Sequence, residues 1–138
     1  MKRSLVTCTV LLAAIFVAPV ALSPAGAQKR PLTMLDRLVD GRWEFRLRGQ
    51  PDRVERMCLR SGRNLIQLRH PDQACDRLVV EDSDMSVIVQ YTCKGRGYGR
   101  THIRRESDRL IQVESQGIAG GLPFEFIAEG RRVGDCPA

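Results

Sequence analysis

Two histidines and one of the three lysines of this 138-residue chain form the candidate catalytic set in the sequence. His70 and His102 could act as acid and base, and Lys94 could hold a phosphate during RNA cleavage. The simpler interpretation is structural. His70 lies at the end of an expected helix, where the negative helix end favours a solvated imidazole, and His102 alternates with Arg100 and Arg104 as on a polar strand face. A small basic hydrolase of the ribonuclease type, using His70 and His102, is therefore the alternative function.

A second group of chemically capable residues is a run of arginines around one tyrosine. The basic side chains outnumber the acidic ones, 22 Lys plus Arg against 16 Asp plus Glu, for a formal net charge of +6. A cationic hairpin with an aromatic side chain could bind an anionic glycan, a lipid headgroup or an envelope protein. Nucleic acid is not expected, because a secreted protein seldom meets it. The candidate binding patch consists of Arg96, Tyr98, Arg100, Arg104 and Arg105.

Four of the five cysteines have no close partner in the sequence. Cys58, Cys75, Cys93 and Cys136 are separated by gaps of 16, 17 and 42 residues, whereas a four-cysteine zinc site needs closely spaced pairs. We therefore expect no metal and no cofactor, and we interpret these cysteines as two structural disulfides. The favoured pairs are Cys58 with Cys75 and Cys93 with Cys136. The rival connectivity pairs Cys75 with Cys93.

The first 27 residues have the pattern of a secretory signal peptide. Lys2 and Arg3 precede an apolar run over residues 5–22, and small residues at 24–27 predict cleavage after Ala27. Cys8 would leave with this segment. The remaining domain, residues 28–138, would be periplasmic or secreted, with no transmembrane segment after removal of the signal.

The periodicity of apolar residues predicts a mainly β domain. Short amphipathic helices are expected over residues 31–40, with Thr33 as a cap, and over residues 63–70. Alternation of apolar and polar residues predicts an antiparallel meander curled into a small barrel or sandwich, with two disulfides. Glycines at 117–121 predict a link between two of its strands. The expected strands cover residues 41–48, 54–60, 75–81, 85–93, 98–105, 110–115 and 122–129.

Large apolar residues are scarce, and aromatic residues make up only 5% of the chain. A roomy internal pocket would compete with the core that a domain of this size needs. An external protein interface is therefore expected in place of a lipid cavity.

The short motifs of the chain form a connected series. Gly-Arg-Trp-Glu at 41–44 is followed by the four cysteines, and Arg-Arg-Val-Gly-Asp-Cys at 131–136 closes it. This series resembles a family of small secreted Gram-negative bacterial proteins grouped as a domain of unknown function, with a G-x-W-E start, four cysteines and a C-terminal R-x-G-D-C motif. The resemblance implies a periplasmic location and no established activity. We expect a non-enzymatic binding or envelope-associated module.

Overall fold

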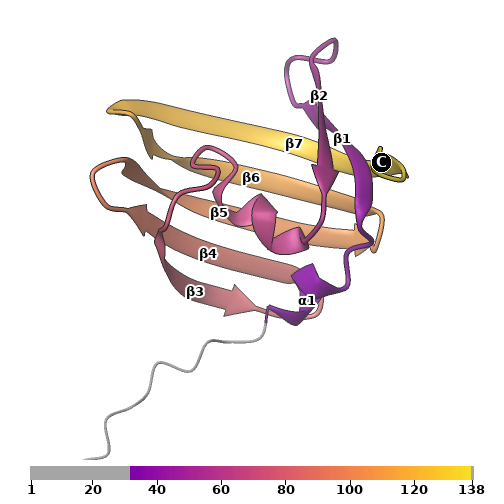
Figure 1. The fold of residues 1–138 in the computed structure, drawn as a ribbon, viewed down its shortest axis with the longest axis horizontal. Helices are drawn as coiled ribbons and strands as arrows, with labels where there is room; N and C mark the ends of the chain where they lie inside the picture. Colours follow the sequence, from indigo (N-terminus) through magenta and orange to yellow (C-terminus); the bar gives the residue numbers. More distant parts are fainter. Residues whose placement is uncertain (1–31, 138) are drawn as a thin grey trace, which may run out of the picture.

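Seven antiparallel strands form one curved sheet in the computed structural model, which describes residues 32–137 (Figure 1). The predicted mainly β, antiparallel fold is confirmed, and the sheet stays open, with β2 and β3 as its edges. The expected signal peptide and Cys8 lie outside the described residues. The strand order is β2-β1-β7-β6-β5-β4-β3. The strands are β1 (Gly41–Leu47), β2 (Val54–Leu59), β3 (Asp76–Asp82), β4 (Ser86–Cys93), β5 (Gly97–Ser107), β6 (Leu110–Ala119) and β7 (Leu122–Gly134).

The predicted alternation decides which side of each strand faces the core. In β1, Trp43 and Phe45 are buried on the inner face while Arg42 points outward. In β4, every second residue is buried in the same way, as expected for the alternation of side chains along a strand. These residues are Val87, Val89, Tyr91 and Cys93. Met85 was expected to continue this series, but it precedes β4 and is exposed.

Two short helical segments cover the inner face of the sheet (Figure 1). They are α1 (Thr33–Asp36) and the 3₁₀-helix η1 (Gly62–Gln67). The Arg63 guanidinium joins them, since its Nε and Nη2 donate to the Asp36 carboxylate at 2.8 and 2.7 Å. These hydrogen bonds hold the pKa of Asp36 below its ordinary value. The core lies between these segments and the sheet, and Leu35, Leu65 and Ile66 are fully buried there.

Both helical segments are shorter than predicted. Leu32, not Thr33, occupies the N-cap position of α1. The second segment is a 3₁₀-helix capped by Ser61, whose hydroxyl accepts the Arg63 N–H. It packs so closely on α1 that a Cβ at Gly62 would stand 2.2 Å from the Leu35 carbonyl oxygen. The lengths of α1 and η1 depend on this tertiary packing, so the periodicity of the sequence could not predict them.

Three strands are longer than predicted, namely β5, β6 and β7. Residues 117–119 were assigned to a glycine-rich link but continue β6, and the turn itself is made by Gly120 and Gly121 with φ of 58° and 82°. Beyond residue 129, β7 continues to Gly134 because it pairs with β1 along this length. A partner strand that is distant in sequence supplies hydrogen bonds that local patterning does not reveal.

The favoured disulfide connectivity is wrong, and its rival is correct. The bridges are Cys75–Cys93 and Cys58–Cys136, with Cα atoms 4.2 and 5.5 Å apart. Cys75 and Cys93 flank the last residue pair of the β3–β4 hairpin. Cys136 reaches Cys58 because Arg42 of β1 pairs with Cys58 on one side and Gly134 on the other. The favoured pairing failed because it did not anticipate that β7 lies next to β1.

Two disulfides are typical of proteins that fold in an oxidising compartment. Within residues 32–137, no helix has the length and apolar character needed to cross a membrane.

Candidate functional site

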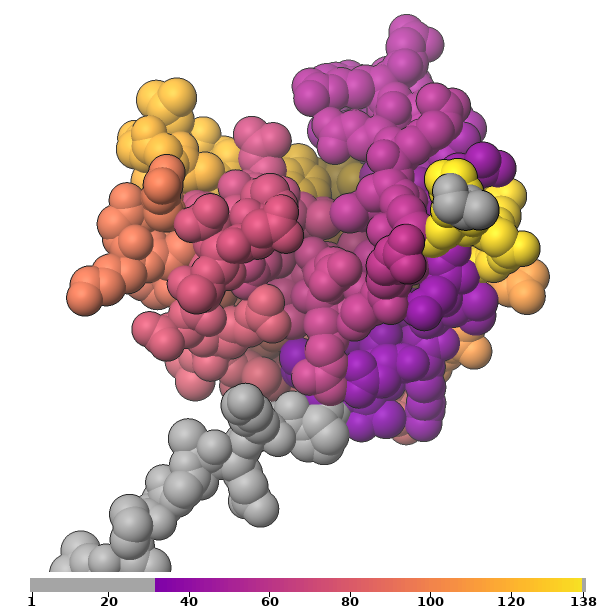
Figure 2. All heavy atoms as spheres, in the orientation of Figure 1, coloured from indigo at the N-terminus to yellow at the C-terminus, as the bar shows by residue number. Residues whose placement is uncertain are grey.

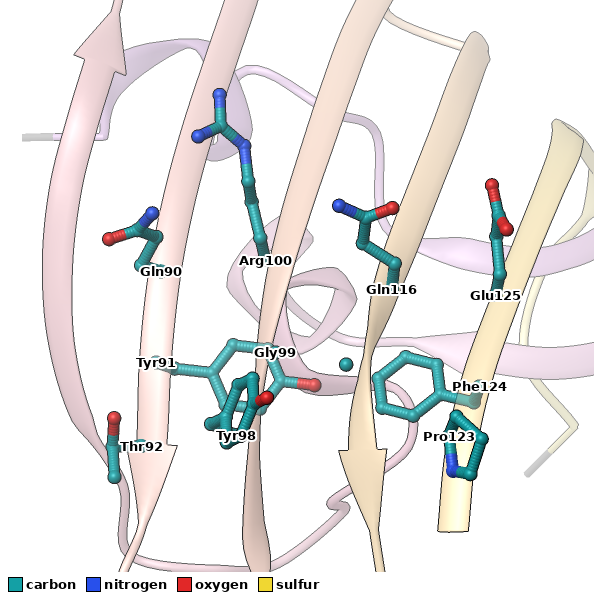
Figure 3. Close-up of a pocket in the computed structure, with 11 residues that line it drawn as sticks. Gln90, Tyr91, Thr92, Tyr98, Gly99, Arg100, Gln116, Pro123, Phe124 and Glu125 are labelled. Carbon is teal, nitrogen blue, oxygen red and sulfur yellow. The ribbon is translucent and has the colours of Figure 1, made fainter.

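The outer face of the sheet carries a row of polar side chains that crosses four strands. The strand register places Gln90, Arg100, Gln116 and Glu125 side by side on β4, β5, β6 and β7. All four are exposed, and Figure 3 shows them standing on the same side of the sheet. Neighbouring strands lie about 4.8 Å apart, so the row presents amide, guanidinium, amide and carboxylate groups at regular intervals.

A shallow hollow of about 920 Å³ lies beside this row. Its other side carries Thr92, Tyr98 and Pro123, and Tyr98 is 55% exposed. Its lining also includes Gly99 and Gly117, which are neighbours in the next row of residues, and Figure 3 shows Gly99 between the polar row and Tyr98. A flat polymer could therefore lie across the strands between an aromatic ring and a line of hydrogen-bonding groups.

Three residues of the predicted patch share this outer face. Tyr98, Arg100 and Arg104 alternate along β5 with the buried inner positions. Arg96 lies in the preceding turn and is exposed. Arg105 does not join them, because its guanidinium contacts the Asp84 carbonyl oxygen and forms an ion pair with Asp108 at 2.6 Å. We refer below to Tyr98, Arg100, Arg104, Gln90 and Gln116 as the outer patch.

The two arginines of the outer patch keep their charge available. No ion pair reaches Arg100 or Arg104 from any described residue. Arg100 is flanked by Gln90 and Gln116, which are neutral. Glu114, an acid of the adjacent strand, lies opposite His102 and not opposite either arginine. The site therefore presents two arginines without ion-pair partners in the described part of the chain, and the carboxylates of Glu114 and Glu125 border the same surface.

His70 is buried on the inner face, so the expectation that it is a solvated helix-end residue is wrong. It is 4% exposed, and its ring makes edge contacts with Tyr91 and Phe124. Its Nδ1 lies 3.3 Å from the Tyr91 hydroxyl, and its Nε2 lies 3.2 Å from the Arg96 carbonyl oxygen. Burial raises the pKa of Tyr91. This arrangement holds η1 to the sheet.

The structure does not bring His70 and His102 together. Thr101 points inward and donates to the Ile66 carbonyl oxygen at 2.6 Å, so the next residue, His102, faces outward. There its Nε2 lies 3.0 Å from the Ser86 hydroxyl. The sheet separates the two imidazoles, and Lys94 lies in the exposed β4–β5 turn. These residues cannot act together on one substrate in this fold.

The cysteines contribute to the fold and not to the site, since all four are in disulfides. In the part of the chain that the structure describes, no three His, Cys, Asp or Glu side chains gather closely enough to hold a metal ion.

Sequence reasoning missed the amide residues of the site. Gln90 and Gln116 carry no charge and belong to no motif, and only the strand register reveals that they flank Arg100. The outward alternation of β4 could have placed Gln90 on a polar face, but nothing local could have placed Gln116 beside it.

No family model, no curated protein and no solved structure matches this chain. The site is therefore interpreted from its own geometry and chemistry.

Proposed function

We propose that the protein is a non-enzymatic binding module of the bacterial envelope, located in the periplasm, that binds an anionic glycan through its outer patch. The observation that carries this proposal is the unpaired Arg100 between two exposed amides and beside the exposed ring of Tyr98. The signal-peptide pattern and the two disulfides support the periplasmic location.

Each part of the outer patch matches one feature of such a ligand. The C–H face of a sugar ring packs on an aromatic ring such as Tyr98. Arg100 can donate two parallel hydrogen bonds to a carboxylate or phosphate, and glutamine amides can both donate to and accept from hydroxyl groups. The hollow is open, so a polymer could pass through it without threading a chain end.

The test is isothermal titration of the protein with alginate oligosaccharides, whose sugars carry carboxylates, and with uncharged dextran. We expect alginate to bind, and we expect rising salt to weaken its binding. Arg100→Gln should weaken alginate binding roughly tenfold, because a hydrogen bond to a charged group contributes about 1.5 kcal/mol. Tyr98→Ala should weaken it as well.

The matched control is Arg69→Gln, which removes an exposed arginine of η1's C-terminal flank and leaves the outer patch intact. Equal binding of dextran and alginate, or alginate binding that neither Arg100→Gln nor Tyr98→Ala reduces, would show that the outer patch is not an anionic glycan site.

A further inference from the structure

A second hollow, of about 460 Å³, lies on the inner face of the sheet. It opens between the β1–β2 hairpin and the end of η1, with the first half of β7 behind it. Figure 2 shows this depression above η1, beside the projecting hairpin. We call it the inner groove. It lies beside the packed core and not within it, so the expectation that a pocket must compete with the core does not apply to it.

The inner groove has an apolar floor that the protein leaves partly uncovered. Phe45 is buried beneath it, while the other large apolar side chains are only half-buried. Its volume falls within the range of small-molecule sites, about 300–1,000 Å³, and exposed apolar surface of this kind gains free energy when a ligand covers it. The apolar residues that line it are Phe45, Leu47, Met57, Leu68, Phe124 and Phe126.

One cation of the inner groove is free to meet a ligand. The Arg69 guanidinium carbon lies 5.7 Å from the centre of the Phe124 ring, and Arg69 takes part in no ion pair among residues 32–137. The other two arginines are occupied, since Arg53 pairs with Glu55 at 3.0 Å and Arg56 pairs with Glu44 at 2.9 Å.

The carboxylates of the groove do not cancel this charge. Glu55 is already held by Arg53, and Glu125, which borders this groove as well as the outer hollow, forms no ion pair with Arg69. Arg69 remains as a stacked guanidinium at one end of an apolar surface. This combination is complementary to a ligand with an apolar chain and one anionic end.

We infer that the inner groove binds a fatty acid, with the alkyl chain on the apolar floor and the carboxylate on Arg69. The stacking on Phe124 restricts the guanidinium, so less conformational entropy is lost when the carboxylate binds. This site is separate from the outer patch, and it does not depend on the proposed glycan binding.

The experiment compares laurate with lauryl alcohol as probes, because the two share a chain and differ at the charged end. The oxidised, exported protein is first washed with fatty-acid-free albumin, and binding is followed by titration calorimetry. We expect the protein to bind laurate more tightly than lauryl alcohol. Arg69→Gln should weaken laurate binding roughly tenfold and leave the alcohol unchanged.

Arg100→Gln is the matched control, since it removes one unpaired arginine from the opposite face. It should leave laurate binding unchanged, so the two proposals can fail independently. Arg69 is exposed, and its substitution should not disturb folding, which the circular dichroism spectrum checks. If laurate and lauryl alcohol bind equally, if Arg69→Gln leaves laurate affinity unchanged, or if neither probe binds, the inference is overturned.

Discussion

The two hydrogen-bond partners of His70 decide which tautomer its neutral ring adopts. The Arg96 carbonyl oxygen can only accept a hydrogen bond, so the His70 Nε2 must carry a proton. In the neutral ring Nδ1 then accepts the Tyr91 O–H. The imidazole links η1, β4 and the β4–β5 turn through these two bonds. Its role is therefore to hold these segments together.

Tyr91→Phe should lower the free energy of unfolding by about 1–2 kcal/mol near neutral pH, because it leaves a buried nitrogen of His70 without a donor. Urea unfolding of the two proteins measures the difference. His102, which bonds to Ser86 on the outer face, supplies the control. Ser86→Ala should lower the free energy of unfolding clearly less than Tyr91→Phe, because the Ser86–His102 hydrogen bond is only partly buried.

The stabilisation by Tyr91 should also fade at high pH. Burial raises the pKa of the folded tyrosine, whereas the unfolded tyrosine ionises near its ordinary value of about 10. The contribution of Tyr91 to the free energy of unfolding is therefore fully present below about pH 10. It falls as the pH rises from the pKa of the unfolded tyrosine through that of the folded one. The difference between wild type and Tyr91→Phe should shrink across this interval, and a constant difference would contradict the assignment.

Among the elements, the sheet is shaped by one row that places two aromatic rings beside two glycines. Tyr91, Gly99, Gly117 and Phe124 are direct neighbours across β4, β5, β6 and β7. A Cβ at Gly99 would stand 2.6 Å from the Tyr91 ring, and one at Gly117 would stand 2.1 Å from the Tyr98 carbonyl oxygen. The Tyr91 ring thus covers Gly99, and covering a glycine with an aromatic ring is a device that helps to fix strand register.

Gly99→Ala should destabilise the protein by about 2 kcal/mol, because the new methyl group displaces the Tyr91 ring from its place beside His70. Thermal unfolding followed by circular dichroism measures the loss. Gly134→Ala is the matched control in β7, where a Cβ would meet only the flexible Arg42 guanidinium at 3.3 Å. Equal transition temperatures for the two variants would show that the close contact at Gly99 is not important.

The sequence predicts what is local in these elements and misses what depends on partners. Alternating residues correctly indicated β1 and β4, turn residues separated the other strands, and Gly41 correctly indicated the start of β1. The aromatic row, the burial of His70 and the amides beside Arg100 all depend on register between strands. One sequence contains no direct information about that register, so the outer patch could be predicted only in its arginines and tyrosine.

The disulfides act on the whole molecule by closing two loops of very different length. Cys58 and Cys136 are 78 residues apart, and Cys75 and Cys93 are 18 apart. The loop-entropy relation gives about 4.5 and about 3 kcal/mol for loops of these lengths. The longer bridge should therefore contribute more to stability, and it anchors the C-terminal end of β7 to the edge strand β2.

Removing the longer bridge with Cys58→Ala and Cys136→Ala should lower the free energy of unfolding more than removing the shorter one. The shorter bridge is removed with Cys75→Ala and Cys93→Ala. The expected difference in unfolding free energy is about 1 kcal/mol, measured by urea unfolding. Peptide mapping without reductant gives an independent check of the connectivity. A peptide that links Cys58 to Cys75 would contradict the structure.

The position of β7 has a consequence for the order in which the protein can fold. The last strand of the chain lies between β1 and β6, so the β1–β2 hairpin has no partner in the sheet until the final residues arrive. Contacts between such distant segments slow folding, because the chain must close a long loop before it gains them. On the proposed export route, which delivers the N-terminus first, the chain cannot complete this sheet during its passage. Folding of the sheet and closure of the Cys58–Cys136 bridge would then follow the arrival of β7.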